Sequence, residues 1–443
     1  MNKKNSQLIF SIITPVFNTE KYLVRSILSI INQKFQKVEL ILIDDGSNDK
    51  SGEICKKFSK NFNFIKFVKN NKNKGVSKSR NLGLKIAKGQ YIIFLDSDDF
   101  LVANSLKKIF KNSIKNKDQN DIIIFNKHNF TSGKKNYVNT NPYIILNKNK
   151  SVGSKIALNQ LNKNQEISFF RRYIFSKRFL EKNKIKFSNE VKYAEDQEFI
   201  TKSLCLANKF AVSNVSFYNY CIATGSLAHG MGVQTSSYMI KAIINLANFY
   251  KENEFGILEK NFIIRKISKI FKEFYPRFIC LKDSDIRTIS SIFNKNHYCL
   301  KTLKILSKKE KINPFLQKNN IYKNLLLFKK YLNKKIFFKL KNNINKNIYL
   351  FASNYYALSL SYMLPVLGFK VVSVIDNNKH IIKRDNNLSL MTPSIFCKSV
   401  KNKKNNIFII ICTPNIKSIS QITSQLLKMN FKKKQIYPIS FDL

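Results

Sequence analysis

The chain has 443 residues, of which 44% are hydrophobic and 24% are charged. This length allows about two to four domains, and the apolar content excludes an intrinsically disordered chain. With 78 Lys and Arg against 27 Asp and Glu, the formal net charge is +51, which favours polyanionic partners such as nucleic acid, an anionic membrane or phosphorylated ligands. A codon-biased genome that enriches Lys, Asn, Ile and Phe would give the same charge without any such partner.

The seven cysteines are scattered and include no Cys-x-x-Cys pair. This argues against a disulfide framework or a structural zinc site and favours a reducing cytosol. The apolar run at 8–13 is too short for the core of a signal peptide, and no run of about 18 apolar residues predicts a transmembrane helix. We therefore expect a cytoplasmic protein, with peripheral association at the inner face of the cell membrane as an addition.

Residues 8–125 alternate apolar runs with helical patterns. We predict strands at 8–13, 38–43, 63–68, 91–95 and 121–125, and helices at 20–32, 51–58 and 75–87. Near-continuous apolar runs are typical of strands that helices cover on both faces. The alternation predicts an α/β fold with a mostly parallel, doubly wound sheet flanked by helices, in which ligands bind outside the carboxyl ends of the strands.

The middle of the chain has weaker patterns. Residues 130–165 are rich in Lys and Asn and predict a loop or a weak hairpin, whereas apolar residues recur at helical spacing over 236–345. The part from 301 to 346 contains 14 Lys and one Glu, a net charge of +13. Such a basic amphipathic segment could lie on an anionic membrane, although a packed helix with a solvated lysine face explains it as well.

Strand and helix alternate again after residue 347, with strands at 348–351, 371–375 and 407–412 and a helix at 355–367. This pattern resembles a nucleotide-binding Rossmann half. Its glycine-rich turn is replaced by Ala352-Ser353-Asn354, however, and a backbone without glycines cannot closely approach a pyrophosphate. Asp376 follows the second strand, where a ribose-binding acid would stand. We expect a structural, docking or acceptor-recognition role for this unit, with dinucleotide binding as the alternative.

Three acidic clusters stand out in a chain so poor in carboxylates. They are Asp44-Asp45-Gly46-Ser47-Asn48-Asp49, Asp96-Ser97-Asp98-Asp99 and Glu195-Asp196-Gln197-Glu198. The first two follow predicted strands, and the third opens a predicted helix. Turn chemistry, helix capping and complementation of the helix dipole are the ordinary explanations for such clusters.

A metal site is the sharper interpretation of the second cluster. Asp96 and Asp98 flank a single residue, so that both carboxylates can converge on a Mg²⁺ or Mn²⁺ ion. Such an ion can bridge a diphosphate, which an acidic pair alone would repel. Transfer to a hydroxyl would also need a general base, which the third cluster could supply.

Together these motifs resemble the family 2 glycosyltransferases, which have the GT-A fold. The resemblance covers residues 8–230 and is carried by FSIITPVFNTEKYLVRSILSIINQKF, VELILIDDGSND, NKGVSKSRNLGLKIAKGQYIIFLDSDD and YAEDQEF. It implies an inverting, metal-dependent transfer of a sugar from a nucleotide-sugar, most of all a UDP-sugar, to a hydroxyl of a glycan acceptor. The charge adds the expectation of a lipid-linked acceptor at an anionic membrane, in capsule or lipooligosaccharide synthesis.

The resemblance also implies roles for the donor-site residues. Phe17 would stack near the base of the nucleotide, Asp45 would contact that base, and Arg80 would help to hold the nucleotide or the sugar. Together with the patterns of the later segments, it divides the chain into a GT-A catalytic domain at 1–235, a basic helical region at 236–346 and a small Rossmann-like α/β domain at 347–443.

The remaining implied roles fall on the acidic residues. Asp96 would approach the ribose or the metal, Asp98 would be the main metal ligand, and Asp99 would lie beside it. Asp196 would be the catalytic base, and Glu195 would support it or share the acceptor site. No covalent enzyme intermediate is implied, because the acceptor hydroxyl attacks the anomeric carbon directly.

One position departs from the family pattern. Where the family has Tyr-x-Tyr-Arg, this chain has Tyr218-Asn219-Tyr220-Cys221, so a cationic contact to the diphosphate must come from elsewhere. Candidates are Arg171, Arg172 or a nearby Lys, and His229 could contact the diphosphate or the metal. The alternatives are a catalytically inactive scaffold, suggested by Cys221, and a nucleic-acid binder, suggested by charge alone. No nucleic-acid-binding motif is present, and we expect no such partner.

Overall fold

The structure of the chain is a computed structural model. It describes residues 7–114, 119–132, 170–221, 232–279, 281–294, 340–351, 367–376, 389–400, 406–412 and 416–438, with short pieces between them. The chain forms two compact units, one made of Met1–Ile222 and Phe249–Lys266 and the other of Ala223–Asn248 and Ile267–Leu443. We describe each by itself. The three domains with boundaries at 235 and 346 stay a prediction.

The first unit is built on an eight-stranded sheet in the order β3-β2-β1-β4-β10-β6-β11-β9. The strands are β1 (Phe10–Val16), β2 (Val38–Asp44), β3 (Ile65–Lys69), β4 (Tyr91–Phe94), β6 (Ile122–Phe125), β9 (Ser151–Gly153), β10 (Tyr173–Ser176) and β11 (Lys209–Ser213). Strands β1 to β4 pair in parallel, whereas β10 lies antiparallel between β4 and β6. The carboxyl ends of the first four strands therefore share one edge of the sheet.

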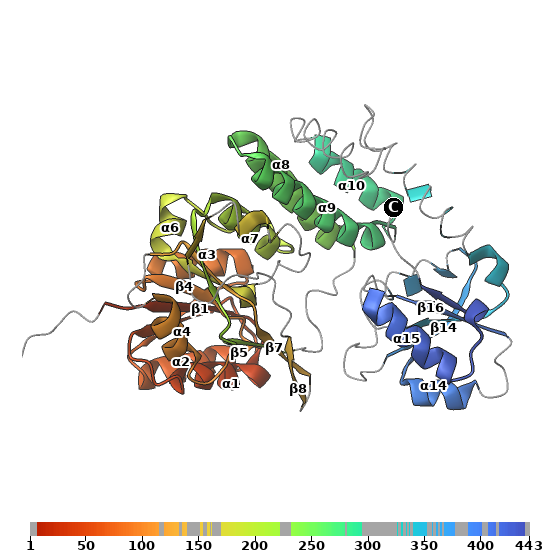
Figure 1. Cartoon of the computed structure of the whole chain (residues 1–443), viewed down its shortest axis with the longest axis horizontal. Coiled ribbons are helices and arrows are strands. Elements are labelled where there is room, and N and C mark those ends of the chain that lie inside the picture. Colours follow the sequence, from red (N-terminus) through yellow and green to blue (C-terminus); the bar gives the residue numbers. More distant parts are fainter. Residues whose placement is uncertain are drawn as a thin grey trace, which may run out of the picture. The chain divides into compact units, whose positions relative to one another are not determined.

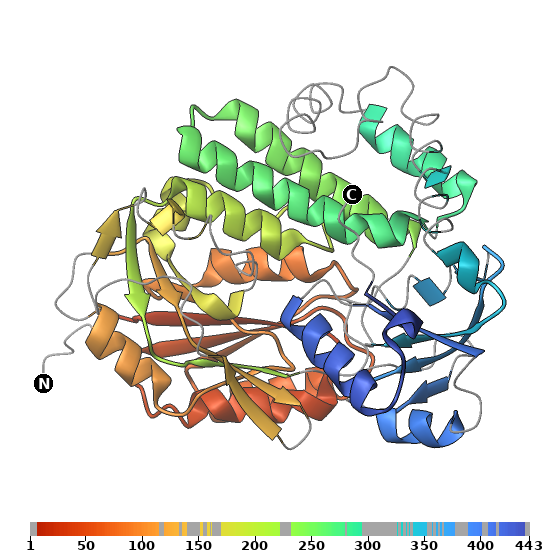
Figure 2. The same ribbon diagram turned by 45° about the vertical axis from the view of Figure 1, so that its right-hand side comes forward.

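Helices cover both faces of this sheet (Figures 1 and 2). On one face lie α1 (Glu20–Ile31), α2 (Ser51–Asn61) and α4 (Ser105–Ile109), and on the other lie α3 (Val76–Ile86), α6 (Lys177–Lys182) and α7 (Glu195–Leu206). Every residue of β2 is buried, including Glu39 and Asp44, as is typical of a strand that helices cover on both faces. The predicted α/β class and mostly parallel sheet are confirmed, and the five strands and three helices predicted for 8–125 are present within a few residues.

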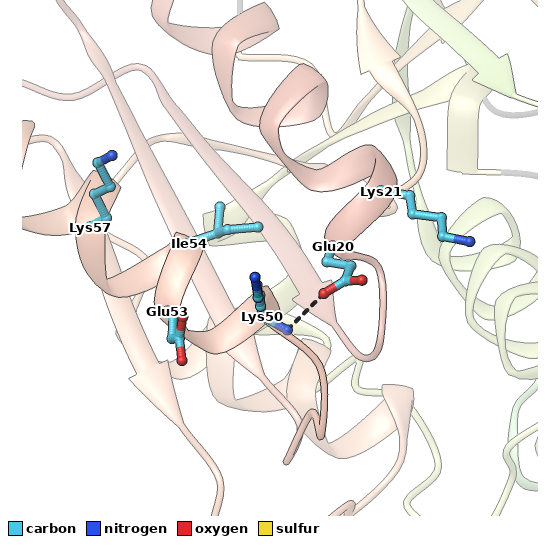
Figure 3. A pocket seen from close by; sticks show the side chains of 6 residues that line it. All are labelled: Glu20, Lys21, Lys50, Glu53, Ile54 and Lys57. Atoms are coloured by element: carbon cyan, nitrogen blue, oxygen red, sulfur yellow. Dashed lines mark hydrogen bonds between the residues drawn. The ribbon is translucent and has the colours of Figure 1, made fainter.

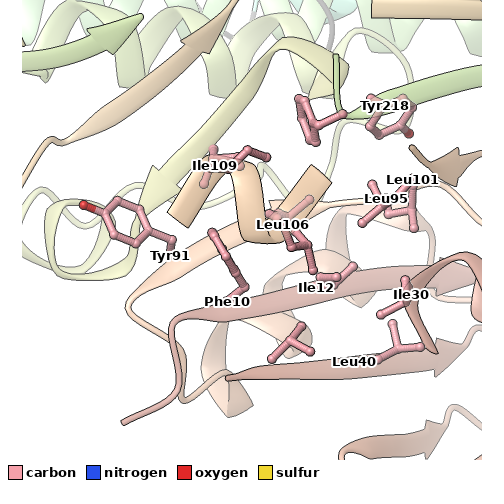
Figure 4. Close-up of a cluster of buried hydrophobic side chains, with 14 of the residues drawn as sticks. Phe10, Ile12, Ile30, Leu40, Tyr91, Leu95, Leu101, Leu106, Ile109 and Tyr218 are labelled. Carbon is pink, nitrogen blue, oxygen red and sulfur yellow. The ribbon is translucent and has the colours of Figure 1, made fainter. Parts of the chain in front are cut away.

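Apolar side chains from strands and helices form the core of this unit (Figure 4). Phe10, Ile12 and Leu40 on the first two strands pack with Ile30 of α1 and with residues much later in the chain, including Tyr218. Burying each such aliphatic side chain contributes about 1.5–3 kcal/mol. This core holds the strand ends rigidly, which makes their loops suitable for a binding site.

A second, four-stranded sheet lies beside the end of β4. Its order is β5-β12-β7-β8, with β5 (Phe100–Leu101), β7 (His128–Ser132), β8 (Lys135–Asn139) and β12 (Tyr218–Cys221). The antiparallel β7–β8 pair confirms a hairpin at the start of the polar segment 130–165. Because β12 pairs with β5, it brings Tyr218 and Cys221 to the acidic turn that follows β4.

The later part of the chain is helical and then α/β. The helical spacing is confirmed by α8 (Val233–Glu252), α9 (Ile257–Ile279) and α10 (Asp283–Asn294), while most of 301–346 lies outside the described residues. Within the described ranges, no helix is both long and apolar enough to cross a bilayer.

A five-stranded parallel sheet follows, in the order β15-β14-β13-β16-β17. Its elements are β13 (Asn347–Phe351), β14 (Lys370–Ile375), β15 (Ser389–Met391), α14 (Pro393–Ser399), β16 (Ile407–Ile411), α15 (Ile416–Lys428) and β17 (Ile436–Pro438). In chain order this is the 3-2-1-4-5 arrangement of a Rossmann unit, as predicted. The segment 352–354, which replaces the glycine-rich turn, lies outside the described residues.

Candidate active site

The carboxyl ends of β1, β2 and β4 bring the predicted donor-site residues to one edge of the sheet. The main-chain N–H of Asp45 donates to the carbonyl of Val16 at 2.8 Å, so the loops after β1 and β2 begin side by side. Phe17 follows β1 and is 42% exposed. An exposed aromatic ring at a strand end can stack on a nucleotide base.

The loops after β1 and β2 are locked together by side chains. Asn18 makes two hydrogen bonds to the β2 loop. Its N–H donates to Ser47 Oγ at 3.0 Å, and its Oδ1 accepts from the Asn48 N–H at 2.9 Å. The Asp49 carboxylate accepts from the Glu20 N–H at 3.1 Å. Burial alone would raise the pKa of Asp49, but hydrogen bonds from the Ser51 side chain and from the Glu20 and Ser51 main chains outweigh it and lower the pKa. Asp49 therefore serves the loop structure.

Asp45 is buried and holds the loop that leads into α3. Its carboxylate accepts from Asn70 Nδ2 at 2.8 Å, from the Lys74 N–H at 3.0 Å and from the Gly75 N–H at 2.7 Å. A carboxylate offers about four acceptor positions, so one is left for a base N–H. The turn beyond it needs Gly46, whose φ is +78° and whose added Cβ would lie 2.8 Å from the Lys72 main chain.

The Asp96–Asp99 turn after β4 divides its carboxylates between structure and the site. Asp99 is fully buried and accepts from the Tyr218 hydroxyl at 2.7 Å and from the Cys221 N–H at 2.7 Å. It thus ties the turn to β12. Burial, together with the negative charge of Asp96, raises the pKa of Asp98 to about 6. A cation beside Asp98 would relieve this repulsion.

Arg80 joins carboxylates of the second and third acidic clusters. Its guanidinium, 4% exposed, donates to Asp96 Oδ1 at 2.8 Å and to Glu195 Oε1 at 2.9 Å, and lies over the Phe170 and Phe187 rings. Burial would lower the pKa of Arg80, but the two carboxylates raise it instead. Arg80 therefore positions two residues that are separate in the sequence: Glu195 lies 115 positions away along the chain, and Asp96 lies 16 positions away.

The third cluster lies at the start of α7, which follows Ala194 in the left-handed conformation (φ 64°). Asp196 is partly exposed there, and its charge contributes to raising the pKa of Arg80. Glu198 is instead buried and paired with Lys202 at 2.6 Å. The structure thus brings Asp96, Glu195 and Asp196 around Arg80, where the sequence predicted a donor site next to a general base.

Cys221 and the candidate replacement arginines take separate places. Arg172 is buried and donates to the Phe125 carbonyl at 3.4 Å, so it faces the core. Arg171 lies with Cζ 4.7 Å from the centre of the Tyr220 ring. The Cys221 thiol accepts from Arg25 Nη2 of α1 at 3.1 Å. His229 lies outside the described residues.

Arg25 is not among the residues singled out from the sequence. A signal was available, because only nine of the 78 basic residues are arginine. In a chain that uses lysine almost everywhere, each arginine is a candidate for a role that needs the planar guanidinium.

The residues of the turn fit a divalent cation. Among the described residues, no group of three or more His, Cys, Asp and Glu could hold a metal ion by itself. Mg²⁺, however, is commonly bound by one or two carboxylates together with substrate phosphates. Asp96 and Asp98 provide such a pair, and burial together with the nearby charge of Asp96 raises the pKa of Asp98.

A hollow of about 440 Å³ lies at the amino ends of α1 and α2. Figure 3 shows its lining, which is Glu20, Lys21, Lys50, Glu53, Ile54 and Lys57. The Lys50 N–H donates to Glu20 Oε2 at 2.9 Å across it. Its three lysines are offset by two glutamates, so its net positive charge is too small to favour a diphosphate.

Several known proteins resemble about half of this chain. The family model described as glycosyl transferase family 2 matches residues 11–179. Glycosyltransferase GlyG of Streptococcus pneumoniae is 30% identical over 229 residues, which are 50% of this chain and 73% of GlyG. The poly(ribitol-phosphate) beta-N-acetylglucosaminyltransferase TarP of Staphylococcus aureus is 34% identical over 215 residues, 48% of this chain and 62% of TarP.

Two further similarities show how far the comparison with known proteins extends. The minor teichoic acid biosynthesis protein GgaB of Bacillus subtilis is 32% identical over 265 residues, which are 57% of this chain but only 28% of GgaB. The crystal structure of residues 1–349 of S. aureus TarS superposes with a TM-score of 0.51 at 20% identity, covering 74% of this chain and 92% of that one. This last likeness concerns the fold. The coverage of GlyG, the matching family model and the strand-end geometry together establish that the chain belongs to the family 2 glycosyltransferases.

Proposed function

We propose that this chain transfers a sugar, with inversion at the anomeric carbon, from a UDP-sugar to a hydroxyl of a cell-envelope glycan. The observation that carries the proposal is the bridge through Arg80, which holds Asp96 of the donor side and Glu195 of the acceptor side on one guanidinium. Such a bridge fixes the distance between a carboxylate that would approach the donor and Glu195, the neighbour of the proposed base Asp196.

On this proposal, Phe17 stacks on the base and Asp45 uses its remaining acceptor position for a base N–H. Asp196 accepts the proton of the acceptor hydroxyl. The hydroxyl oxygen forms its bond to the anomeric carbon while the bond to the diphosphate breaks on the opposite side, and the electron pair leaves with the diphosphate oxygen. A divalent cation held by Asp96 and Asp98 would supply charge stabilisation for that leaving group.

The substrates are the less defined part of the proposal. The names of TarP and GgaB refer to poly(ribitol phosphate) and teichoic acid, which supports an envelope polysaccharide as the acceptor class. Capsule and lipooligosaccharide are the candidate acceptor glycans that the sequence suggests. The TarS fragment that shares the fold is in complex with UDP, so UDP is the first nucleotide to test.

The test is calorimetry with UDP, GDP and CMP, each with and without Mn²⁺. We expect UDP to bind and Mn²⁺ to strengthen its binding at least tenfold. Folded protein that binds none of the three would overturn the donor site and favour the inactive scaffold. Tight binding of GDP or CMP alone would keep the reaction class and change the donor.

We propose separately that the basic segment at 301–346, with its net charge of +13, holds the protein peripherally to an anionic membrane that carries a lipid-linked acceptor. Sedimentation with phosphatidylglycerol vesicles at moderate salt tests this. Protein that stays in the supernatant with these vesicles, as it does with neutral vesicles, would remove the membrane from the proposal without affecting the transfer reaction.

A further inference from the structure

Arg25 places a guanidinium at the rim of the acidic turn. Its Nη2 donates to the Asp98 carbonyl at 2.9 Å and to Cys221 Sγ at 3.1 Å. The guanidinium carbon lies 4.8 Å from the centre of the Phe100 ring and 5.9 Å from that of Tyr22. The side chain therefore reaches from the exposed surface of α1 to a seat formed by the turn and the end of β12.

The charge of this guanidinium acts on the groups around it. Burial and the neighbouring aspartates raise the pKa of Cys221 to about 12, and Arg25 acts in the opposite direction. Arg25 likewise counters the burial and the Asp96 charge that raise the pKa of Asp98. The thiol of Cys221 is thus a neutral acceptor, which can receive a guanidinium where an arginine on β12 would repel it.

The other arginines near the turn are committed elsewhere. Arg80 is 4% exposed and bridges Asp96 and Glu195, and Arg172 is 2% exposed and donates to a core carbonyl. Arg171 is largely buried against Tyr220. Arg25 is exposed, and two of its N–H donors are the ones already used. A guanidinium has five such donors, so it can still bind an oxyanion.

We propose that Arg25, seated on Cys221, is the cation that contacts the diphosphate of the donor, and that it replaces from α1 an arginine otherwise carried by the end of β12. This inference rests on the proposed function and adds to it a substrate-contacting residue. Hydrogen bonds from charged donors to phosphate are among the strong ones in proteins.

The test compares UDP, bound in the presence of Mn²⁺ and measured by calorimetry, with uridine, titrated by NMR. Arg25→Gln keeps amide donors for the seat but removes the charge. We expect it to weaken UDP binding about ten- to a hundredfold, in line with roughly 1.5–3 kcal/mol for a charged hydrogen bond, and to leave uridine binding within about twofold. Arg25→Lys keeps the charge and should retain UDP binding within about fivefold.

A relocation variant makes the test sharper. In Arg25→Ala combined with Cys221→Arg, the guanidinium returns to β12 and fills the space that Arg25 vacates. We expect this pair to bind UDP at least about fivefold more tightly than Arg25→Ala alone. The matched control is Arg178→Gln, which removes an exposed arginine of α6 and should leave both affinities unchanged.

Each outcome decides between the possibilities. Equal losses of UDP and uridine binding in Arg25→Gln would mean that Arg25 only holds the fold of the turn, and unchanged UDP binding would mean that it makes no contact. Either result overturns this inference and leaves the transferase. Wild-type protein that binds no nucleotide overturns the proposed function, and the inference with it.

Discussion

The two acidic loops at the carboxyl ends of β2 and β4 have similar sequences and opposite electrostatics. After β2, the protein's own N–H groups surround the carboxylates: Asp45 accepts three hydrogen bonds, and the pKa of Asp49 is lowered. After β4, burial and mutual repulsion raise the pKa of Asp98 to about 6 and that of Asp99 well above its ordinary value. The first loop is stable without a ligand, and the second is improved by a cation.

The difference teaches how to separate structural carboxylates from functional ones. A carboxylate that the fold stabilises should weaken the fold when it is neutralised. A carboxylate that the fold destabilises and leaves partly exposed, as it does Asp98 but not the hydrogen-bonded Asp99, should strengthen the fold when neutralised and cost function instead. The predictions below use this opposition.

The largest effect is expected at Asp196, outside both loops. Asp196→Asn should lower the turnover number by about 10²–10⁴-fold, because the amide cannot accept the proton of the acceptor hydroxyl. UDP affinity should stay within about twofold, since the base acts on the acceptor. Steady-state transfer assays and calorimetry on the same preparation check this. Near-normal turnover in Asp196→Asn would remove Asp196 from the mechanism.

Asp98→Asn should stabilise the metal-free fold, whereas most substitutions destabilise a protein. Mn²⁺-dependent UDP binding should fall at least about a hundredfold, because a charged metal ligand is lost. The metal-free protein should gain about 1–3 kcal/mol of unfolding free energy at pH 7.5, because two units of raised pKa correspond to roughly 3 kcal/mol. Denaturant unfolding in EDTA measures the second effect.

The control for Asp98→Asn is Asp49→Asn in the other loop. Its carboxylate accepts backbone hydrogen bonds and has a lowered pKa, so neutralising it should destabilise the fold or leave it unchanged. If both variants shift stability in the same direction, the contrast between the loops is wrong.

Asp45→Asn should destabilise the fold by about 1–3 kcal/mol, because an amide nitrogen would face backbone donors that now share one carboxylate. Hydrogen exchange should accelerate at residues 70–75, which Asp45 holds. UDP binding should weaken both through this loop and through the changed contact of Asp45 with the base, with the Mn²⁺ dependence kept. A loss of Mn²⁺ dependence in Asp45→Asn would instead assign Asp45 to the metal site.

The strand-end arrangement of the site was predictable, because apolar runs alternating with helical spacing define a parallel sheet, and parallel strands end at one edge. Within the turn, the sequence could not show that Asp99 accepts a hydrogen bond from Tyr218, whereas burial and the charge of Asp96 destabilise the ionised form of Asp98. That division depends on β12 pairing with β5, and both strands are too short to give a clear pattern.

The long-range contacts were beyond sequence for a similar reason. Arg80 meets Glu195 across 115 residues, and Arg25 meets Cys221 across 196 residues. No local pattern encodes such pairs. The antiparallel strand β10 between β4 and β6, which precedes the third acidic cluster in the chain, consists of four buried residues, Tyr173–Ser176.

The smallest expected effect is the pH dependence of donor binding. The pKa of Asp98 is raised from 3.8 to about 6, and a metal ligand must be deprotonated. Mn²⁺-dependent UDP affinity should therefore be level above about pH 6.5 and fall by up to tenfold per unit below pH 6. For stability the sign is opposite: the folded state takes up this proton at higher pH than the unfolded state, so protonation favours folding as the pH falls from about 6 to about 4. Asp98→Asn should lose that part of the stability profile. A UDP affinity that stays level down to pH 5 would show that burial and the charge of Asp96 raise the pKa of Asp98 less than expected. The electrostatic contrast between the loops after β2 and β4 would then be smaller.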